Sequence, residues 1–383
     1  MKTFIFKCFL FVIPLGFVFV IPLFVVWLGR EYFDANTTAL YQQAHPGSVV
    51  GFAYSTESAR PYKVALINAR HSTVIALGTS RVMQFRKEFF KDQNTFTNAG
   101  GAVTSFSDII SFINEMPEVR PGETKTVLLG IDQEAFLKPL SDVGTRKGDS
   151  VDTRDLLRIG YIIVSGSRRM YTDQFTKFSL WQLYKARMTT SSIGVAALIQ
   201  DDGYRDDGSR IYKSMSDPNI MEIAQRQIEA RAKEIEIDQF VPNNADDLIS
   251  GNIQLLSHAL DIAHAKGITI IGFMQPLPTK EYDATLVSSI SNQKTVTEIP
   301  STAKKVFTEH GYVFDDFTRL DSFGGKDVEF IDRIHGSDLM YAKLTLLLTK
   351  EDPSFGKLVN IDLLKTAIKA STGIFLALTP LQK

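Results

Sequence analysis

The sequence has very little cysteine and no excess of basic charge. Cys8 is the only cysteine in 383 residues, so a disulfide framework and a zinc site made of cysteines are both excluded. The 42 Lys and Arg are balanced by 43 Asp and Glu, which gives a formal net charge of −1. A broad nucleic-acid-binding surface needs a basic excess, so we expect no nucleic acid among the partners. The chain also lacks a G-x-x-x-x-G-K-[ST] phosphate loop and a G-x-G-x-x-G turn after a strand.

The length and composition indicate a globular protein with more than one domain. Apolar residues make up 44% and charged residues 22%, which is ordinary for a folded chain. At about 150 residues per domain, the length predicts two or three domains. We expect a membrane anchor at 1–30, a juxtamembrane linker and lead-in at 31–69, and one α/β domain at 70–383 with an insertion at about 141–245.

Residues 8–28 form an apolar run without any charge. About 20 such residues cross a bilayer core of roughly 30 Å. Lys2 and Lys7 precede the run and Arg30 follows it, so the positive-inside rule predicts a cytoplasmic N-terminus and an exported remainder. A cleaved signal peptide is the alternative, but residues 29–34 offer no A-x-A-like cleavage site. We therefore expect an uncleaved N-terminal transmembrane helix that contacts the lipid bilayer through residues 8–28.

The remaining chain alternates short apolar runs with helical patterns. This alternation predicts βαβ units and a mostly parallel sheet, which we interpret as a three-layer α/β/α domain of flavodoxin-like type. A last amphipathic helix is expected from about Ile361. The expected strands are 72–77, 126–131, 268–273 and 312–317, and the expected helices are 104–116, 248–266 and 301–310.

Residues 141–241 interrupt this rhythm. Between residues 141 and 190 there are nine Lys and Arg against five Asp and Glu. One interpretation is a solvated insertion with no further role. The other is a surface that faces anionic lipid headgroups or an acidic polymer.

Ser80 and the pair Asp332 and His335 are the first candidates for chemistry. Open α/β sheets bind ligands at the carboxyl ends of their strands, and Ser80 follows such an end, two residues after Gly78. A D-x-x-H segment can supply both a base, His335, and the carboxylate that orients it, Asp332. Ordinary turn chemistry at Ser80, and a helix-capping aspartate beside a surface histidine, are the alternatives.

Three further features accompany these candidates. The segment 98–101 (Asn-Ala-Gly-Gly) is expected to be a loop before a helix, and its two glycines allow a close approach of backbone to substrate. The alternative is an ordinary loop with a C-cap glycine. Asp132 follows the strand 126–131, and Arg81 stands next to Ser80. Arg81 can contact an anionic substrate group or form a structural ion pair. The six histidines show no spacing typical of metal ligands, and we expect no metal site.

These segments, in this order, resemble the SGNH/GDSL hydrolase superfamily over roughly residues 70–345. The first family block matches Gly78-Thr79-Ser80-Arg81, which implies that Ser80 is the nucleophile. The second block matches Asn98-Ala99-Gly100 and implies that the Gly100 amide, together with the Ser80 amide, forms the oxyanion hole. The last block, D-x-x-H, implies that Asp332 and His335 complete a catalytic triad.

The chain departs from the family pattern at two positions. Thr79 stands where the first block usually has Asp, a position that supports the turn. Asp132 stands where the third block has an Asn that donates to the oxyanion. An ionised carboxylate only accepts hydrogen bonds, and the loss of one such donor typically costs about 10²–10³ in rate. Asp132 is therefore a doubtful member of the oxyanion hole.

The overall layout narrows the resemblance. An N-terminal anchor, a long insertion and the stretch 330–338 around the D-x-x-H look like SGNH-like proteins of bacterial cell envelopes, which often accompany membrane-bound O-acyltransferases. This implies a serine esterase or O-acyltransferase, without a cofactor, that acts on acyl esters of a cell-envelope glycan outside the cytoplasmic membrane. It also makes a membrane-bound O-acyltransferase a candidate partner. The alternative, favoured by Asp132, is an inactive SGNH-fold protein that binds glycan or scaffolds such an acyltransferase.

Overall fold

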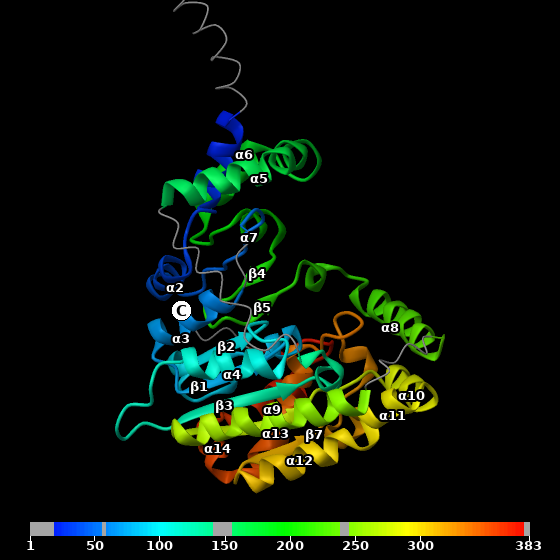
Figure 1. Ribbon diagram of the computed structural model, residues 1–383. Coiled ribbons are helices and arrows are strands. Elements are labelled where there is room, and N and C mark those ends of the chain that lie inside the picture. The colour runs from blue at the N-terminus through cyan, green and yellow to red at the C-terminus, as the bar shows by residue number, and fades with distance from the viewer. Residues whose placement is uncertain (1–18, 56–58, 141–154, 238–244, 379–383) are drawn as a thin grey trace, which may run out of the picture. The chain divides into compact units, whose positions relative to one another are not determined.

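The computed structural model describes residues 19–55, 59–140, 155–237 and 245–378 (Figure 1). The described residues form two compact units. The N-terminal unit contains residues from 1–58, 149–206 and 210–213, and the sheet unit contains residues from 59–148, 207–209 and 214–383. These boundaries differ from the expected ones. Part of the expected lead-in and most of the expected insertion build one unit, because their apolar residues share a core of their own.

The sheet unit is built on five parallel strands, which confirms the α/β class with a mostly parallel sheet. The strands run in the order β2-β1-β3-β6-β7, an order that doubly wound α/β sheets of the flavodoxin type also have. Register pairs include Val74 with Thr126 in β1 and β3, and Ile131 with Met274 in β3 and β6. The strands are β1 (Val74–Gly78), β2 (Phe96–Gly100), β3 (Lys125–Ile131), β6 (Ile268–Met274) and β7 (Val313–Asp316).

Helices cover both faces of this sheet. Alternate side chains of each strand point to opposite faces, so Val127 and Leu129 join one hydrophobic cluster while Leu128 joins the other. Strands buried on both faces are apolar along their whole length, which is why the sequence shows them as continuous runs. The first face packs against α3 (Ala59–Arg70), α4 (Phe106–Glu115), α9 (Ala245–Ala265) and α12 (Ile299–Glu309), and the second against α13 (Asp338–Glu351), α14 (Pro353–Leu358) and α15 (Ile361–Ala370).

Local signals fix several helix ends where the sequence predicts them. The Ser105 hydroxyl accepts a hydrogen bond from the amide of Asp108 and begins α4. Gly267, with φ of +67°, follows the end of α9 in the left-handed conformation that glycine adopts readily. The expected loop at 98–101 is corrected in part, because Asn98, Ala99 and Gly100 are the last residues of β2 and pair with β1.

Shorter helices and 3₁₀ turns connect the main elements of the sheet unit. The helix α8 (Ile220–Ile237) packs against α10 (Thr279–Val287) through Ala232, Ile235 and Ala284, and α11 (Ile290–Thr297) follows α10. The 3₁₀ turns are η1 (Ser80–Gln84), η2 (Lys87–Phe89), η3 (Gln93–Thr95), η4 (Gln133–Leu137), η6 (Lys213–Ser216), η7 (Leu320–Phe323) and η8 (Asp327–Glu329).

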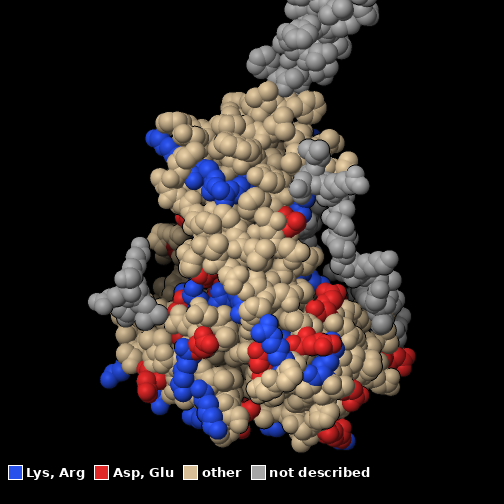
Figure 2. All heavy atoms as spheres, turned by 90° about the vertical axis from the view of Figure 1, so that its left-hand side faces the viewer, with Lys and Arg blue, Asp and Glu red and all other residues tan. Residues whose placement is uncertain are grey.

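The N-terminal unit is mostly helical. Residues 19–29 are helical, and the other elements are α2 (Ala35–Ala44), α5 (Asp155–Thr176), α6 (Leu180–Thr189), α7 (Val195–Gln200) and the antiparallel pair β4 (Gly203–Tyr204) and β5 (Arg210–Ile211). At the level of α5 and α6, the face drawn in Figure 2 shows Lys and Arg but no Asp or Glu. Among the described residues, no helix combines the length and apolarity needed to cross a bilayer, and residues 8–18 of the expected anchor lie outside the described ranges.

Candidate active site

Ser80 follows the carboxyl end of β1, an inner strand that lies between β2 and β3. The strand ends at Gly78, and η1 begins at Ser80 with Thr79 as its N-cap. The Thr79 hydroxyl accepts a hydrogen bond from the amide of Arg81 at 3.3 Å, which shapes the turn. A side chain at Gly78 would place its Cβ 2.7 Å from the carbonyl oxygen of Gly130, so only glycine fits this strand end. The turn therefore places Ser80 just beyond the carboxyl end of β1.

Asp332 and His335 lie in the loop that precedes α13. The Asp332 Oδ1 atom accepts hydrogen bonds from the amides of Ile334 and His335 at 2.9 and 2.8 Å, which folds the D-x-x-H segment into a tight turn. Its Oδ2 atom lies 2.6 Å from the His335 Nδ1 atom. Burial alone raises the pKa of Asp332, but the hydrogen bonds and charge of the His335 ring and the two amides outweigh it and lower that pKa.

The fold brings these three side chains into one chain of contacts. The His335 Nε2 atom lies 2.8 Å from the Ser80 Oγ atom, although the two residues are 255 positions apart. With the Nδ1 proton directed to Asp332, the Nε2 atom carries the lone pair that can accept the Ser80 hydroxyl proton. Nucleophile, base and orienting carboxylate therefore stand in the geometry of a Ser-His-Asp triad.

The Gly100 amide is already engaged in this structure. It donates a hydrogen bond to the Asn98 Oδ1 atom at 2.8 Å, while the Asn98 side-chain nitrogen donates to the carbonyl oxygens of Val82 and Phe85. The Ser80 amide stands at the first position of η1, where no carbonyl of the same turn can accept its proton. Of the two amides expected in the oxyanion hole, that of Gly100 is bound to Asn98, whereas no hydrogen bond among the described residues engages that of Ser80.

Asp132 and Arg81 form an ion pair beside the site. The Arg81 Nη1 atom lies 3.2 Å from Asp132 Oδ1 and 3.3 Å from Gln133 Oε1, and the other terminal nitrogen of Arg81 donates to the carbonyl of Pro276. The side chains of Arg81 and Asp132 are only 9% and 14% exposed. This arrangement matches the structural alternative for Arg81, and it directs the Asp132 carboxylate to a cation instead of a substrate oxygen.

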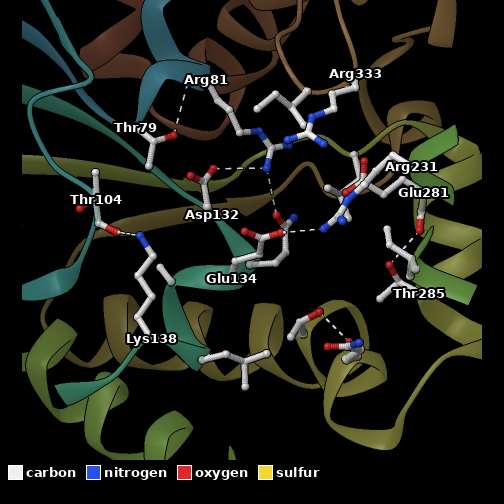
Figure 3. A pocket seen from close by; sticks show the side chains of 18 of the residues that line it. Thr79, Arg81, Thr104, Asp132, Glu134, Lys138, Arg231, Glu281, Thr285 and Arg333 are labelled. Atoms are coloured by element: carbon white, nitrogen blue, oxygen red, sulfur yellow. Dashed lines mark hydrogen bonds and ion pairs between the residues drawn. The ribbon is translucent and has the colours of Figure 1, made fainter. Parts of the chain in front are cut away.

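A cavity of about 430 Å³ adjoins Ser80 and lies wholly within the sheet unit (Figure 3). Its lining combines polar and charged side chains with apolar ones such as Leu137, Ile235 and Leu277. The hydroxyl and amide groups come from Thr79, Thr104, Gln133, Thr285, Asn292 and Thr295, and the charged groups from Arg81, Lys138, Arg231, Arg333, Asp132, Glu134 and Glu281. Most of these residues carry no motif. Thr79, Arg81 and Asp132 belong to segments that the sequence analysis names, and Arg333 could also have been found, because it lies inside the D-R-I-H segment.

Glu281 is a buried acid in the wall of this cavity. It is 6% exposed, and its Oε2 atom has no hydrogen-bond partner among the described residues. Burial raises the pKa of Glu281, and the charges of Arg81 and Arg231 offset this only in part. A carboxyl group with a raised pKa can donate a hydrogen bond to a ligand as well as accept one. No motif points to Glu281, because it lies on α10, outside every segment that the sequence analysis names.

In the described ranges, no group of three or more His, Cys, Asp or Glu side chains is arranged to hold a metal ion. Comparison of the chain with models of known protein families and with curated proteins gives no match in either.

Proposed function

We propose that the protein is a membrane-anchored, extracytoplasmic serine esterase or O-acyltransferase of SGNH type that acts on acyl esters of a cell-envelope glycan. The observation that carries the proposal is the contact chain from Ser80 through His335 to Asp332, with distances of 2.8 and 2.6 Å. Two sequence features support the location, namely the uncharged run at 8–28 and the lysines that precede it.

The chemistry follows from the position of each group. The Ser80 Oγ atom attacks the acyl carbonyl while His335 Nε2 accepts its proton, and Asp332 stabilises the imidazolium that forms. The Ser80 amide donates to the developing oxyanion. His335 then returns the proton to the leaving alcohol, which leaves an acyl group on Ser80. Attack by water completes an esterase cycle, and attack by a sugar hydroxyl completes a transferase cycle.

The cavity supports a substrate rich in hydroxyl groups. Threonine, asparagine and glutamine side chains supply neutral donors and acceptors along its wall. Four cationic and three acidic side chains line it, so its net charge is close to zero when all of them are ionised. Such a lining suits a sugar better than a long apolar acyl chain. A glycan acceptor or an O-acylated glycan is therefore the substrate class that we propose.

A second candidate function is that of an inactive glycan-binding or scaffolding protein beside a membrane-bound O-acyltransferase. It is favoured by the oxyanion site, where Asn98 occupies the Gly100 amide and Arg81 holds the Asp132 carboxylate. The loss of one oxyanion donor costs about 10²–10³ in rate, which leaves a slow enzyme but does not abolish chemistry. Because the contacts among Ser80, His335 and Asp332 are intact, we favour the active enzyme over the inactive candidate.

The full chain in detergent tests the proposal, because the helix at 19–29 shares the core of the N-terminal unit and should not be removed. We expect hydrolysis of p-nitrophenyl acetate, and a loss of about 10³-fold or more in Ser80→Ala. Ser322→Ala, an exposed serine in η7, is the matched control. A fluorophosphonate should label the wild type and spare Ser80→Ala, with the adduct found on Ser80 by peptide mass spectrometry. A folded wild type with neither hydrolysis nor labelling would favour the inactive candidate.

A further inference from the structure

The helix α5 has two apolar faces that lie on opposite sides. One face contributes Ile162, Ile163 and Met170 to the core of the N-terminal unit. The opposite face is exposed and still apolar, with residues spaced by three, four or eleven positions so that they share one side of the helix. These residues are Leu157 (65% exposed), Tyr161 (60%), Val164 (76%) and Phe175 (80%).

The helix α6 repeats this pattern. Leu183 is fully buried in the same core, whereas Trp181, Tyr184 and Met188, at spacings of three and four, form an exposed stripe on the other side. Trp181 and Tyr184 stack with their ring centroids 5.5 Å apart, and the Lys185 ammonium lies over the Trp181 ring. Large apolar patches on a protein surface mark interaction sites. We therefore expect this exposed aromatic stripe to contact a partner or a lipid surface.

The helical residues 19–29 belong to the same layer. Val25, Val26 and Leu28 are buried against α5 and α6, while Val20, Leu23 and Trp27 are exposed at the spacing of one helix face. This helix contains the last residues of the apolar run at 8–28, from which we expect a membrane anchor. The exposed faces of α5 and α6 therefore belong to the unit that packs on the end of the expected anchor.

The charge on these helices fits an anionic surface. Residues 155–189 contain six Lys and Arg but only two Asp and Glu, and one of the two acids, Asp173, is buried. Arg168, Arg169, Lys177 and Lys185 are exposed around the apolar stripes, and Figure 2 shows the basic character of the visible face at this level. Trp and Tyr beside Lys and Arg are the residues that concentrate where protein meets lipid headgroups.

We propose that the exposed faces of α5 and α6 lie in the interface of the bilayer that holds the anchor, in contact with anionic headgroups. Neither helix is a membrane span, and the mixture of apolar and basic side chains is typical of helices that lie in the plane of the interface. A soluble or membrane protein is the competing occupant, but the connection to the anchor through one shared core favours lipid. The inference rests on the anchor in the proposed function and goes beyond it.

The two tryptophans of the chain make the test direct. In the full chain, Trp27→Phe leaves Trp181 on α6 as the only tryptophan, and Trp181→Phe leaves Trp27 at the end of the expected anchor; excitation at a wavelength that tryptophan alone absorbs excludes tyrosine emission. Each variant is reconstituted in nanodiscs of phosphatidylcholine and phosphatidylglycerol, with plain or brominated acyl chains. We expect brominated lipid to remove most of the Trp181 emission. We also expect Arg168→Gln combined with Lys185→Gln to weaken this quenching when phosphatidylglycerol is present.

The other outcomes separate the two proposals. If Trp27 is quenched and Trp181 is not, the anchor stands and the interfacial position of α6 is overturned. If neither is quenched in a protein with a native circular dichroism spectrum, the anchor and the inference fail together. If Trp181 is shielded from aqueous iodide but insensitive to brominated lipid, a protein surface covers α6 and the lipid proposal is wrong.

Discussion

The Asn98 Oδ1 atom accepts a hydrogen bond from the Gly100 amide at 2.8 Å. The amide that we expect in the oxyanion hole is therefore already bound by a side chain of the same strand. The same amide group of Asn98 donates to the carbonyls of Val82 and Phe85 in the segment that carries Ser80. Asn98 thereby links the end of β2 to the segment that begins with Ser80 in η1. It acts as a positioning residue, and its loss should disturb the site without removing any reacting atom.

We expect Asn98→Ala to lower both stability and activity. The Gly100 amide loses its acceptor and the Phe85 carbonyl loses its Asn98 donor, while the Val82 carbonyl keeps the amide of Phe85. We therefore expect a cost of about 1–3 kcal/mol in the free energy of unfolding. Displacement of Ser80 by even about 1 Å can reduce kcat by up to about 10²-fold. Urea unfolding and ester hydrolysis measure the two effects, with the exposed Asn94→Ala as control. A faster enzyme would show instead that the freed Gly100 amide serves the oxyanion.

The buried pair of Arg81 and Asp132 should be strongly coupled. Either Arg81→Gln or Asp132→Asn removes one member of this buried ion pair, which typically costs about 3–5 kcal/mol. We expect the double variant to cost less than the sum of the two single variants, with a coupling of about 1–3 kcal/mol. Urea unfolding of the wild type, the two single variants and the double variant measures this coupling as a double-mutant cycle. Strict additivity would mean that the pair contributes nothing beyond the separate contacts of each residue.

Asp332→Asn should keep the fold and remove most of the activity. An amide at this position can no longer hold the His335 ring with its Nε2 lone pair toward Ser80, and such a change costs about 10⁴-fold in kcat in a serine protease triad. Asp321→Asn, an exposed aspartate in η7, is the matched control and should leave kcat unchanged. Full activity in Asp332→Asn would contradict the triad.

The lowered pKa of Asp332 also predicts how stability depends on pH. Because the folded state binds the proton of Asp332 less readily than the unfolded state, this carboxylate stabilises the fold above the ordinary pKa of aspartate. The contribution disappears as the pH falls through the lowered pKa. The free-energy difference between wild type and Asp332→Asn should therefore be larger at pH 7 than at pH 3. Denaturant titrations at both values measure it, and a constant difference would exclude the linkage.

Glu281 predicts the opposite trend. Its raised pKa means that the folded state binds its proton more tightly, so ionisation of Glu281 lowers stability as the pH rises above the ordinary pKa of glutamate. Glu281→Gln removes this penalty and should stabilise the protein at pH 7 more than at pH 4. Denaturant titrations of this variant and of Glu222→Gln, an exposed control on α8, test the prediction. Equal stabilisation at both values would show that the pKa of Glu281 is the same in the folded and the unfolded protein.

Local patterns in the sequence were sufficient to predict the class of the fold. The runs around 72–77, 126–131 and 268–273 are buried on both faces, so their apolar character is visible without any neighbour. Helix ends such as Ser105 and Gly267 depend on hydrogen bonds and φ angles within a few residues. The strand at Phe96–Gly100 was missed because it contains threonine, asparagine and glycine, and only pairing with β1 makes it a strand.

The parallel α/β core and the short motifs that contain Ser80, Asp332 and His335 could be predicted from local sequence, because backbone periodicity and tight turns are local properties. The contact of His335 with Ser80, the hydrogen bond from the Gly100 amide to Asn98 and the position of Glu281 in the cavity wall are visible only in the folded structure. The core that α5 and α6 share with residues 19–29 is visible only there as well. These features could not be predicted because hydrogen bonds and the burial of side chains depend on which distant elements the fold brings together.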